Sequence, residues 1–329
     1  MINKNKKVLI CGISGQDGAY LTQLLLGKGY EVWGTSRDAQ VAGFGNLATL
    51  GIKGRVKFLS MAPNDFRSVL TALTRSEPDE IYYLAGQSSV GLSFEQPAET
   101  LESVTLGTLN LLEGIRFLKK KIRFYHAGSS ECFGEHGDAA ANEETSFRPR
   151  SPYGVAKSSA HWLVANYREA YGLFACNGIL FNHESSLRPE RFVTKKIVLA
   201  ACRIAAGSAE HLTLGRLDIV RDWGWAPEYV EAMWRMMQQD AADDFIISTG
   251  EPHSLQEFVE ATFAAVGLDW RTYVKADPTL FRPTDLARSV GCADKALAKL
   301  GWQAKYKMND IVKMMVEEVT MISGINNRD

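Results

Sequence analysis

The chain has 329 residues, of which 46% are hydrophobic and 23% charged, and its formal net charge is −1. This composition is typical of a soluble globular protein with one large domain or two closely packed ones. The charges form no basic or acidic blocks, which argues against nucleic acid as the main partner. The apolar run that follows the basic N-terminus, residues 8–11, is too short for a signal peptide or a membrane span. We therefore expect a cytoplasmic protein with no membrane partner.

The five cysteines, at positions 11, 132, 176, 202 and 292, are scattered along the chain and include no Cys-x-x-Cys pair. An odd and dispersed set predicts neither a disulfide framework nor a zinc site. We expect no metal in this protein.

A nucleotide-binding unit is predicted at the N-terminus. Residues 7–11 form a short apolar, β-branched run typical of a buried strand, and residues 19–29 have the pattern of an amphipathic helix. The turn between them has the spacing Gly-x-x-Gly-x-x-Gly. Glycines at these positions permit a tight turn and the close approach of a pyrophosphate to the start of the helix. The expected cofactor contacts in this turn are Gly12, Ser14, Gly15, Gln16, Asp17 and Gly18.

The end of the second strand indicates which dinucleotide binds. This strand is expected at residues 31–35, and it runs into Ser36, Arg37 and Asp38. An acidic residue at its end would bind an unphosphorylated ribose, whereas Arg37 can pair with a 2′-phosphate. NADP is therefore favoured over NAD, and Asp38 is the residue that argues against this choice.

The next part of the chain alternates between strand and helix patterns. Strands are expected at residues 55–59, 79–85 and 122–127, and helices at 66–74 and 99–118. This alternation predicts an α/β fold with a doubly wound parallel sheet, of the Rossmann type. Ligands of such sheets collect at the carboxyl ends of the strands. Residues 12–18, 86–89 and 129–131 should therefore surround one crevice.

The stretch from Ser151 to Lys157 contains the pattern Tyr-x-x-x-Lys. On a helix, Tyr153 and Lys157 lie one turn apart on the same face, so the ammonium can approach the phenol. A neighbouring cation favours the phenolate and lowers its pKa. We expect Tyr153 to act as a base on a sugar hydroxyl near neutral pH.

The C-terminal part is expected to form a smaller α/β lobe packed on the sheet. A strand is predicted at residues 178–182, a helix at 192–206, a helix at 229–239 and a strand at 245–248 that returns to the first domain. The remainder, from residue 254, has a mainly helical pattern. The expected division is residues 1–178 plus about 226–250 for the cofactor domain, and about 179–225 plus 251–329 for the substrate lobe.

Further strings accompany these motifs in a fixed order. They include Ser-Ser-Glu-Cys-Phe-Gly at 129–134, Asn-His-Glu-Ser at 182–185, Phe-Val-Thr-Lys-Lys-Ile at 192–197, Arg-Asp-Trp-Gly at 221–224 and Arg-Pro at 282–283. From about residue 7 to about residue 302, the chain resembles the extended short-chain dehydrogenase/reductase family. Within that family it is most similar to the GDP-mannose 4,6-dehydratases.

The resemblance implies roles for residues at matching positions. Ser129, Glu131, Tyr153 and Lys157 match the catalytic residues, and Leu84 and Gln87 match cofactor contacts. The implied substrate contacts are Ser88, Ser130, Asn182, Val193, Lys196, Arg221 and Arg282. His183 is expected to be structural and to lie beside the nucleotide pocket.

The implied reaction is an internal redox dehydration of GDP-mannose with NADP. Tyr153 takes the proton from O4 while hydride leaves C4, Glu131 removes the C5 proton, water leaves from C6, and the hydride returns to C6. The cofactor is regenerated in each turnover. A homodimer or homotetramer is expected.

Several positions differ from the family pattern, and they leave alternatives open. Asp38, Met61, Ser89 and Arg216 stand where the family commonly has Arg, Asp, His and Asn. Most of these changes affect cofactor or nucleotide recognition. The alternatives are a 4,6-dehydratase of another GDP-hexose or a GDP-heptose, an NDP-sugar epimerase or 4-keto reductase, and a non-catalytic nucleotide-binding protein.

Overall fold

A computed structural model of the protein describes residues 6–322. Its largest feature is a seven-stranded sheet with the order β10-β6-β5-β4-β1-β2-β3, in which every neighbouring pair is parallel. The predicted doubly wound parallel sheet is therefore confirmed. The strands are β1 (Lys7–Cys11), β2 (Glu31–Ser36), β3 (Lys57–Ser60), β4 (Glu80–Tyr83), β5 (Arg123–Ser129), β6 (Ala175–Leu180) and β10 (Asp244–Ile247).

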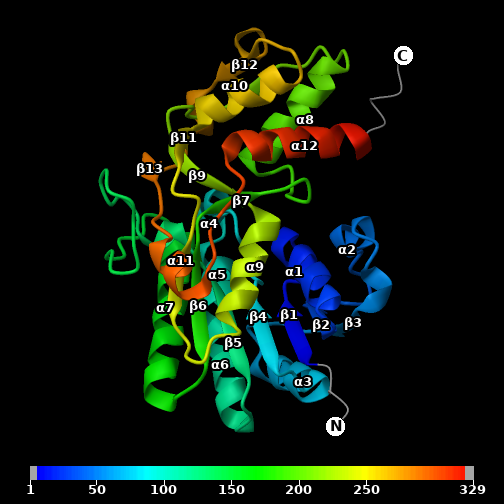
Figure 1. Ribbon diagram of the computed structural model, residues 1–329, viewed down its shortest axis with the longest axis vertical. Helices are drawn as coiled ribbons and strands as arrows, with labels where there is room; N and C mark the ends of the chain where they lie inside the picture. The colour runs from blue at the N-terminus through cyan, green and yellow to red at the C-terminus, as the bar shows by residue number, and fades with distance from the viewer. Residues whose placement is uncertain (1–5, 323–329) are drawn as a thin grey trace.

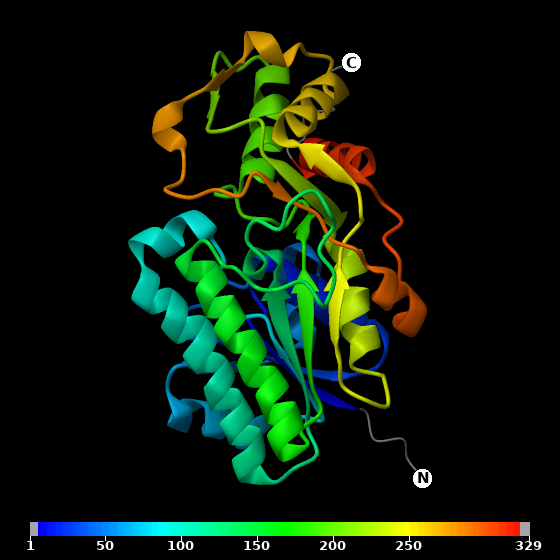
Figure 2. The ribbon, with the colours of Figure 1, turned by 90° about the vertical axis from the view of Figure 1, so that its left-hand side faces the viewer.

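Strand β1 shows how the sheet is covered on both faces. Val8 and Ile10 belong to one core cluster, and Leu9 and Cys11 to another. All four side chains are fully buried, as expected for a central parallel strand between two helical layers. One layer contains α1 (Gln16–Gly27), α2 (Gly45–Thr49) and α9 (Ala226–Met236), and the other contains α3 (Phe66–Ser76), α6 (Gly107–Leu118) and α7 (Pro152–Tyr171). Figure 2 shows α6 and α7 on one side of the sheet and the yellow α9 on the other.

The long helix predicted over residues 99–118 is divided in the structure. It consists of α5 (Pro97–Leu101), a π-helical turn over Glu102–Leu106 and α6, and the short α4 (Val90–Glu95) precedes it. The wider turn lets the Ser103 carbonyl accept a hydrogen bond from the Tyr83 hydroxyl. Gly107 is required at this point, because a Cβ there would lie 2.0 Å from the Tyr83 oxygen. Single π-helical turns of this kind are frequent near functional sites.

A smaller lobe lies beyond the carboxyl ends of the parallel strands (Figures 1 and 2). It contains a four-stranded sheet of β7 (Asn182–Glu184), β9 (Val220–Trp225), β11 (Pro252–Ser254) and β13 (Arg288–Ser289), and a pair formed by β8 (Leu212–Leu214) and β12 (Val274–Ala276). Its helices α8 (Val193–Ala205), α10 (Leu255–Ala265) and α12 (Met308–Ile322) surround one core, while α11 (Asp294–Leu300) packs near β10. The segment after residue 254 is thus helical as predicted, with short strands in addition. Four 3₁₀ turns complete the described elements, at Lys53–Arg55, Ser130–Cys132, Trp270–Thr272 and Pro278–Leu280.

A buried carboxylate connects the lobe to the end of the large sheet. Asp222, on β9, is inaccessible to solvent. It accepts hydrogen bonds from the backbone and hydroxyl of Thr249, at 2.9 and 2.7 Å, and from the Gly250 backbone at 2.9 Å. Since residues 249 and 250 follow β10, this carboxylate sets the position of β9 relative to the parallel sheet.

Over residues 6–322, no helix combines the length and the apolar character that crossing a membrane would need. The same range contains no group of three or more His, Cys, Asp or Glu residues arranged to hold a metal ion.

Candidate active site

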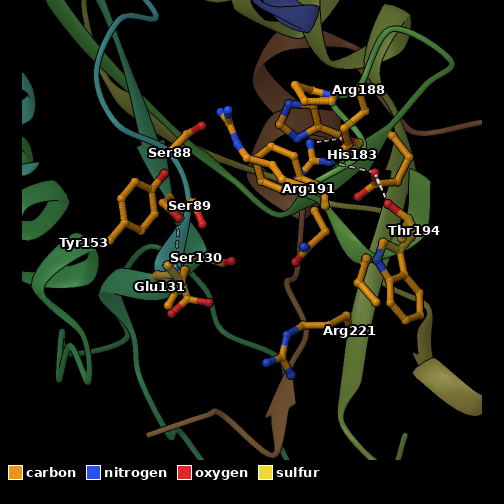
Figure 3. Close-up of a pocket in the computed structure, with 18 of the residues that line it drawn as sticks. Ser88, Ser89, Ser130, Glu131, Tyr153, His183, Arg188, Arg191, Thr194 and Arg221 are labelled. Atoms are coloured by element: carbon orange, nitrogen blue, oxygen red, sulfur yellow. Dashed lines mark hydrogen bonds and ion pairs between the residues drawn. The ribbon is translucent and has the colours of Figure 1, made fainter. Parts of the chain in front are cut away.

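A cavity of about 520 Å³ lies between the carboxyl ends of β1, β4 and β5 and the smaller lobe. Figure 3 shows part of its lining, with Tyr153 and Glu131 facing Arg221 and His183 across the opening. The cavity brings together most of the residues predicted for the site: Gly12, Gly15, Gln16, Asp17, Gly18, Leu84, Ser88, Ser129, Ser130, Glu131, Tyr153, Lys157, Asn182, Val193, Lys196, Arg221 and Arg282.

The glycine turn forms a cradle that fits a dinucleotide pyrophosphate. Gly12 has φ +89°, and a Cβ on it would lie 2.8 Å from the Ala85 nitrogen. A Cβ on Gly18 would lie 2.4 Å from the Gly12 carbonyl oxygen. Helix α1 then begins after Gly15, whose backbone is extended and which offers no side-chain cap. The first N–H groups of α1 are therefore available to an anion, which is how such turns bind a pyrophosphate.

Three predicted cofactor residues do not line the cavity. The Arg37 side chain is 82% exposed, and its ion pair with Glu99 is 3.5 Å long. Ser14 is exposed, and its carbonyl accepts from Asn46 at 3.1 Å. The Gln87 amide donates to the Ser89 carbonyl at 2.8 Å and to the Thr100 hydroxyl at 3.2 Å. Gln87 therefore braces the turn after β4.

Asp38 is also engaged by the protein. Its Oδ1 accepts from the Gln40 backbone at 2.9 Å and caps the turn that follows β2. This carboxylate shapes the loop beside Arg37.

Tyr153 and Lys157 lie on the first turns of α7, as predicted. The helix starts there because Ser151 accepts from the Gly154 backbone at 3.0 Å and Pro152 occupies the first position. The Lys157 ammonium is 5.7 Å from the centre of the Tyr153 ring and donates to the Ala127 carbonyl at 2.7 Å. Both side chains are buried.

The pKa predicted for Tyr153 is wrong for this structure. Burial raises the pKa of Tyr153 above its ordinary value, and a hydrogen bond with Ser129 only partly opposes this. Burial also lowers the pKa of Lys157 from 10.5 to about 8. The expected cation effect is missing because desolvation disfavours both charged forms, and because the ammonium is directed at the Ala127 carbonyl.

Glu131 lies in the 3₁₀ turn directly after β5. Its backbone N–H donates to the Ser129 hydroxyl at 3.3 Å, and its carboxylate lines the cavity. Burial raises the pKa of Glu131, whereas the charges of Arg221 and Arg282 oppose this shift and Asp285 adds to it. Glu131 is therefore a carboxyl whose pKa is tuned by the cationic end of the cavity.

That cationic end belongs to the smaller lobe. Arg221 is buried, and its guanidinium contacts Asp285 at 3.0 Å and the Leu286 carbonyl at 2.8 Å. Arg282 lies 3.5 Å from the same carboxylate. Lys196 donates to the Thr213 carbonyl at 2.8 Å. It has no carboxylate within 4.0 Å among residues 6–322, so its charge is not neutralised there. Val193 is the first residue of α8, which begins without a side-chain cap.

Three residues that line this cavity were not identified from the sequence. Asp285, Arg188 and Arg191 were not predicted as site residues, yet all three line the cavity. His183 donates from Nδ1 to the Phe181 carbonyl at 2.7 Å and from Nε2 to Asp17 at 2.9 Å, which fits the structural role expected for it. Burial alone would raise the pKa of Asp17, but His183 lowers it to about 2. In the sequence, the one sign that Arg188 and Arg191 belong to the site was their place in a loop just before a predicted helix.

Known proteins resemble the chain along nearly its whole length. The family model described as GDP-mannose 4,6 dehydratase matches residues 9–315. A GDP-mannose 4,6 dehydratase of Arabidopsis thaliana is 45% identical, over 97% of this chain and 88% of the relative. The Vibrio cholerae GDP-mannose 4,6-dehydratase is 40% identical, over 95% of this chain and 93% of the relative.

Solved structures agree with this relationship. The Thermus thermophilus UDP-glucose 4-epimerase, in complex with NAD, has a TM-score of 0.83 and 27% identity, and covers 94% of this chain and 98% of its own. The dTDP-glucose 4,6-dehydratase of Streptomyces venezuelae, at 20% identity and a TM-score of 0.85, shares the fold. With a family model that matches most of its length and relatives at 40% identity or more, the chain belongs to the GDP-mannose 4,6-dehydratase family of hydro-lyases.

Proposed function

We propose that this protein is an NADP-dependent GDP-mannose 4,6-dehydratase that converts GDP-mannose into GDP-4-keto-6-deoxymannose and water. One observation carries the proposal beyond family membership. Glu131 shares one cavity with Tyr153 and Lys157, at the end that faces Arg221 and Arg282. An epimerase or a reductase needs only the tyrosine and the lysine, whereas removal of a proton from C5 needs a further base.

The cofactor would be held by the glycine turn of residues 12–18 and by the start of α1. When bound, the nicotinamide group accepts a hydride from the sugar and later returns it. Arg37 supports NADP over NAD, because its exposed guanidinium can pair with a 2′-phosphate and, among residues 6–322, would have to release just one ion pair, the 3.5 Å pair with Glu99. We place the cofactor domain at residues 1–178 plus about 226–250, and the sugar-nucleotide lobe at about 179–225 plus 251–329.

In this proposal Tyr153 takes the proton of the sugar O4 as a phenolate, with Ser129 hydrogen-bonded to its oxygen, and this requires its pKa to fall from the value that burial gives it in this structure. Lys157 holds a positive charge nearby and orients the first turn of α7 through the Ala127 carbonyl. Loss of the O4 proton and of hydride from C4 leaves a 4-ketone, which acidifies the proton on C5. Glu131 removes that proton and passes it to the C6 hydroxyl, which leaves as water. The double bond left between C5 and C6 would then take the returning hydride at C6 and a proton at C5. A raised pKa suits Glu131, because a group that takes up and releases a proton works best when its pKa lies near the working pH.

The lobe residues would bind the nucleotide sugar. Arg221 and Arg282 form a pair of guanidinium groups that can bind diphosphate oxygens. Lys196 and the uncapped start of α8 at Val193 add positive charge at the same wall. Asn182 would contact the base, and Ser88 and Ser130 would place hydroxyl groups near the hexose.

We also propose a homodimer or homotetramer located in the cytoplasm. The outer surface of α5 to α7 exposes large apolar side chains that a monomer would leave in water: Leu101, Leu106, Phe117, Val155 and Trp162. Trp162 alone is 63% exposed. Light scattering on the purified protein would give the number of copies, and a monomer at micromolar concentration would contradict this part of the proposal.

The proposed reaction is tested by incubating purified protein with NADP and GDP-mannose and recording the mass of the product. Loss of one water without net consumption of NADPH is the expected result. Retention of the C6 oxygen would indicate an epimerase, and net oxidation of NADPH a reductase. If GDP-mannose is unchanged while another GDP-hexose or a GDP-heptose loses water, the substrate assignment is wrong. If none of these sugars reacts, the protein binds nucleotides without catalysis.

A further inference from the structure

Five arginines line the cavity, and four of them are paired with carboxylates of the protein. Arg188 lies 2.8 Å from Glu184, Arg216 lies 2.6 Å from Asp218, and Arg221 and Arg282 share Asp285. The fifth, Arg191, has no carboxylate within 4.0 Å among the residues from 6 to 322. Its guanidinium lies over the ring of Phe192, whose centre is 5.2 Å away.

The contacts of the loop around Arg191 explain why this side chain has no carboxylate partner among the described residues. Arg188 fixes the loop, because it donates to the His183 carbonyl at 2.9 Å in addition to its pair with Glu184. The neighbouring Glu190 is directed at Arg203, 3.4 Å away. The backbone is held as well, since the Phe192 N–H donates to the Pro189 carbonyl at 3.1 Å. The unpaired guanidinium is thus carried on a braced segment.

Arg191 is directed into the cavity. Figure 3 shows its side chain reaching across the opening toward Ser88, which lies on the opposite wall after β4. Helix α8 begins two residues later, and its 13 residues present an uncapped N-terminus at the same wall. The free cation and the positive end of the helix macrodipole therefore act on the same space. An anion placed there would gain from both.

The charge balance of the cavity shows why Arg191 is better placed than the other arginines to bind such an anion. Arg221 and Arg282 have a net charge of only +1 once Asp285 is included. A diphosphate approaching this pair must compete with that carboxylate. Within the described range, residues 6–322, no carboxylate competes for Arg191, so its interaction with a phosphate oxygen would break no ion pair there.

We propose that Arg191 is a further binding residue of the site, and that its guanidinium closes over a diphosphate held in the cavity. The inference rests on the proposed function, which brings two diphosphates into this cavity, one in the nucleotide sugar and one in the dinucleotide. Either can supply the oxygen atoms. Sequence reasoning could not have identified this role, because the absence of a partner depends on where Glu184 and Glu190 are directed.

Calorimetric titration of the full chain tests the proposal, with GDP and NADP titrated separately. Arg191→Gln is expected to weaken the binding of at least one of them by roughly 10- to 100-fold, the usual effect of losing a hydrogen bond to a charged group. Arg191→Lys should restore part of the loss, since it retains the charge without the planar fork. The matched control is Arg67→Gln on α3, an exposed arginine outside the cavity, which should leave both affinities unchanged.

The pattern of losses identifies the ligand. A loss for GDP alone assigns Arg191 to the nucleotide sugar, a loss for NADP alone assigns it to the cofactor, and a loss for both means that it contacts each of them. The proposal is overturned if both dissociation constants stay within about two-fold of the wild type in a variant with an unchanged melting temperature. It also falls if Arg67→Gln causes the same losses. Dehydration is a separate readout: a protein that binds GDP through Arg191 but forms no product would contradict only the proposed function.

Discussion

Burying the Lys157 ammonium costs free energy, and this cost can be measured because it makes the stability of the protein depend on pH. Burial lowers its pKa from 10.5 to about 8 in the folded protein. Between these two values the unfolded chain binds more protons than the native state, so the free energy of unfolding rises with pH across this window. Below pH 8 the native protein bears the full cost of a buried ammonium. The difference between the two pKa values corresponds to about 3 kcal/mol.

The substitution Lys157→Met removes this cost and retains a side chain of similar length. It also removes the hydrogen bond to the Ala127 carbonyl, which should cost about 1–3 kcal/mol. The two effects nearly cancel at pH 7, but only the first depends on pH. Relative to the wild type, the variant should therefore lose about 3 kcal/mol between pH 7 and pH 10.5. In a chain of 329 residues this is a relative shift in melting temperature of roughly 4–5 °C.

Thermal unfolding followed by intrinsic fluorescence, without nucleotides and at steps between pH 7 and pH 10.5, gives the comparison directly. Lys275→Met on β12, where the lysine is exposed, controls for the loss of one positive charge. A difference between Lys157→Met and wild type that stays constant across the range would refute the reasoning. It would mean that water reaches the ammonium and that burial does not depress the pKa of Lys157.

Four further substitutions probe the rest of the site. Glu131→Gln should leave GDP binding intact and slow dehydration by roughly 10²–10⁴-fold; wild-type turnover in this variant would exclude Glu131 as the base. Asp285→Asn removes a negative charge that raises the pKa of Glu131, so the rise of kcat with pH should move to lower pH, and an unmoved profile would show that the two carboxyls are uncoupled. Arg37→Ala should weaken NADP far more than NAD in equilibrium titrations, and equal losses would remove the case for NADP. Asp222→Asn removes the charge of a buried carboxylate that accepts three hydrogen bonds, and it should destabilise the protein by about 2–4 kcal/mol, measured as a fall in melting temperature. A change below about 0.5 kcal/mol would mean that other contacts hold β9 against the end of the parallel sheet.

The parallel sheet could be predicted because its signals are local. Each strand is a short apolar run, each helix has its own periodicity, and the glycine turn joins the first of them. The short strands of the smaller lobe have no such signal. Strand β13 has two residues and pairs with β9, almost seventy residues earlier, so nothing in its own sequence marks it as a strand. The π-helical turn was missed for a related reason: the apolar pattern continues through it, and only the contact between Tyr83 and Ser103 requires the wider turn.

Residue types and spacing predicted which side chains line the cavity better than they predicted the pKa values of those side chains. Tyr153, Lys157 and Glu131 line one cavity, as the motifs indicated. The pKa of Tyr153 was predicted in the wrong direction, because a spacing of four residues gives proximity but no information on burial. Desolvation depends on how completely the surrounding elements cover a group, which is decided by segments distant in sequence.

Contacts between the two lobes link the segment that would hold the cofactor to the segment that would hold the nucleotide sugar. Gln16 donates to the His183 carbonyl at 3.1 Å and accepts from Ser185 at 2.7 Å, and Asp17 pairs with the His183 ring. Although burial opposes it, Asp17 raises the pKa of His183, so both members of the pair stay charged over a wide range below neutral pH. These contacts join the start of α1, which would hold the pyrophosphate, to β7, which pairs with the strand of Arg221. In the proposed reaction a hydride would leave the sugar and later return to it, so the nucleotide sugar and the dinucleotide would have to keep one fixed relation throughout. A direct connection between the elements proposed to bind them would supply that relation before either ligand arrives, without a separate closure of the lobes.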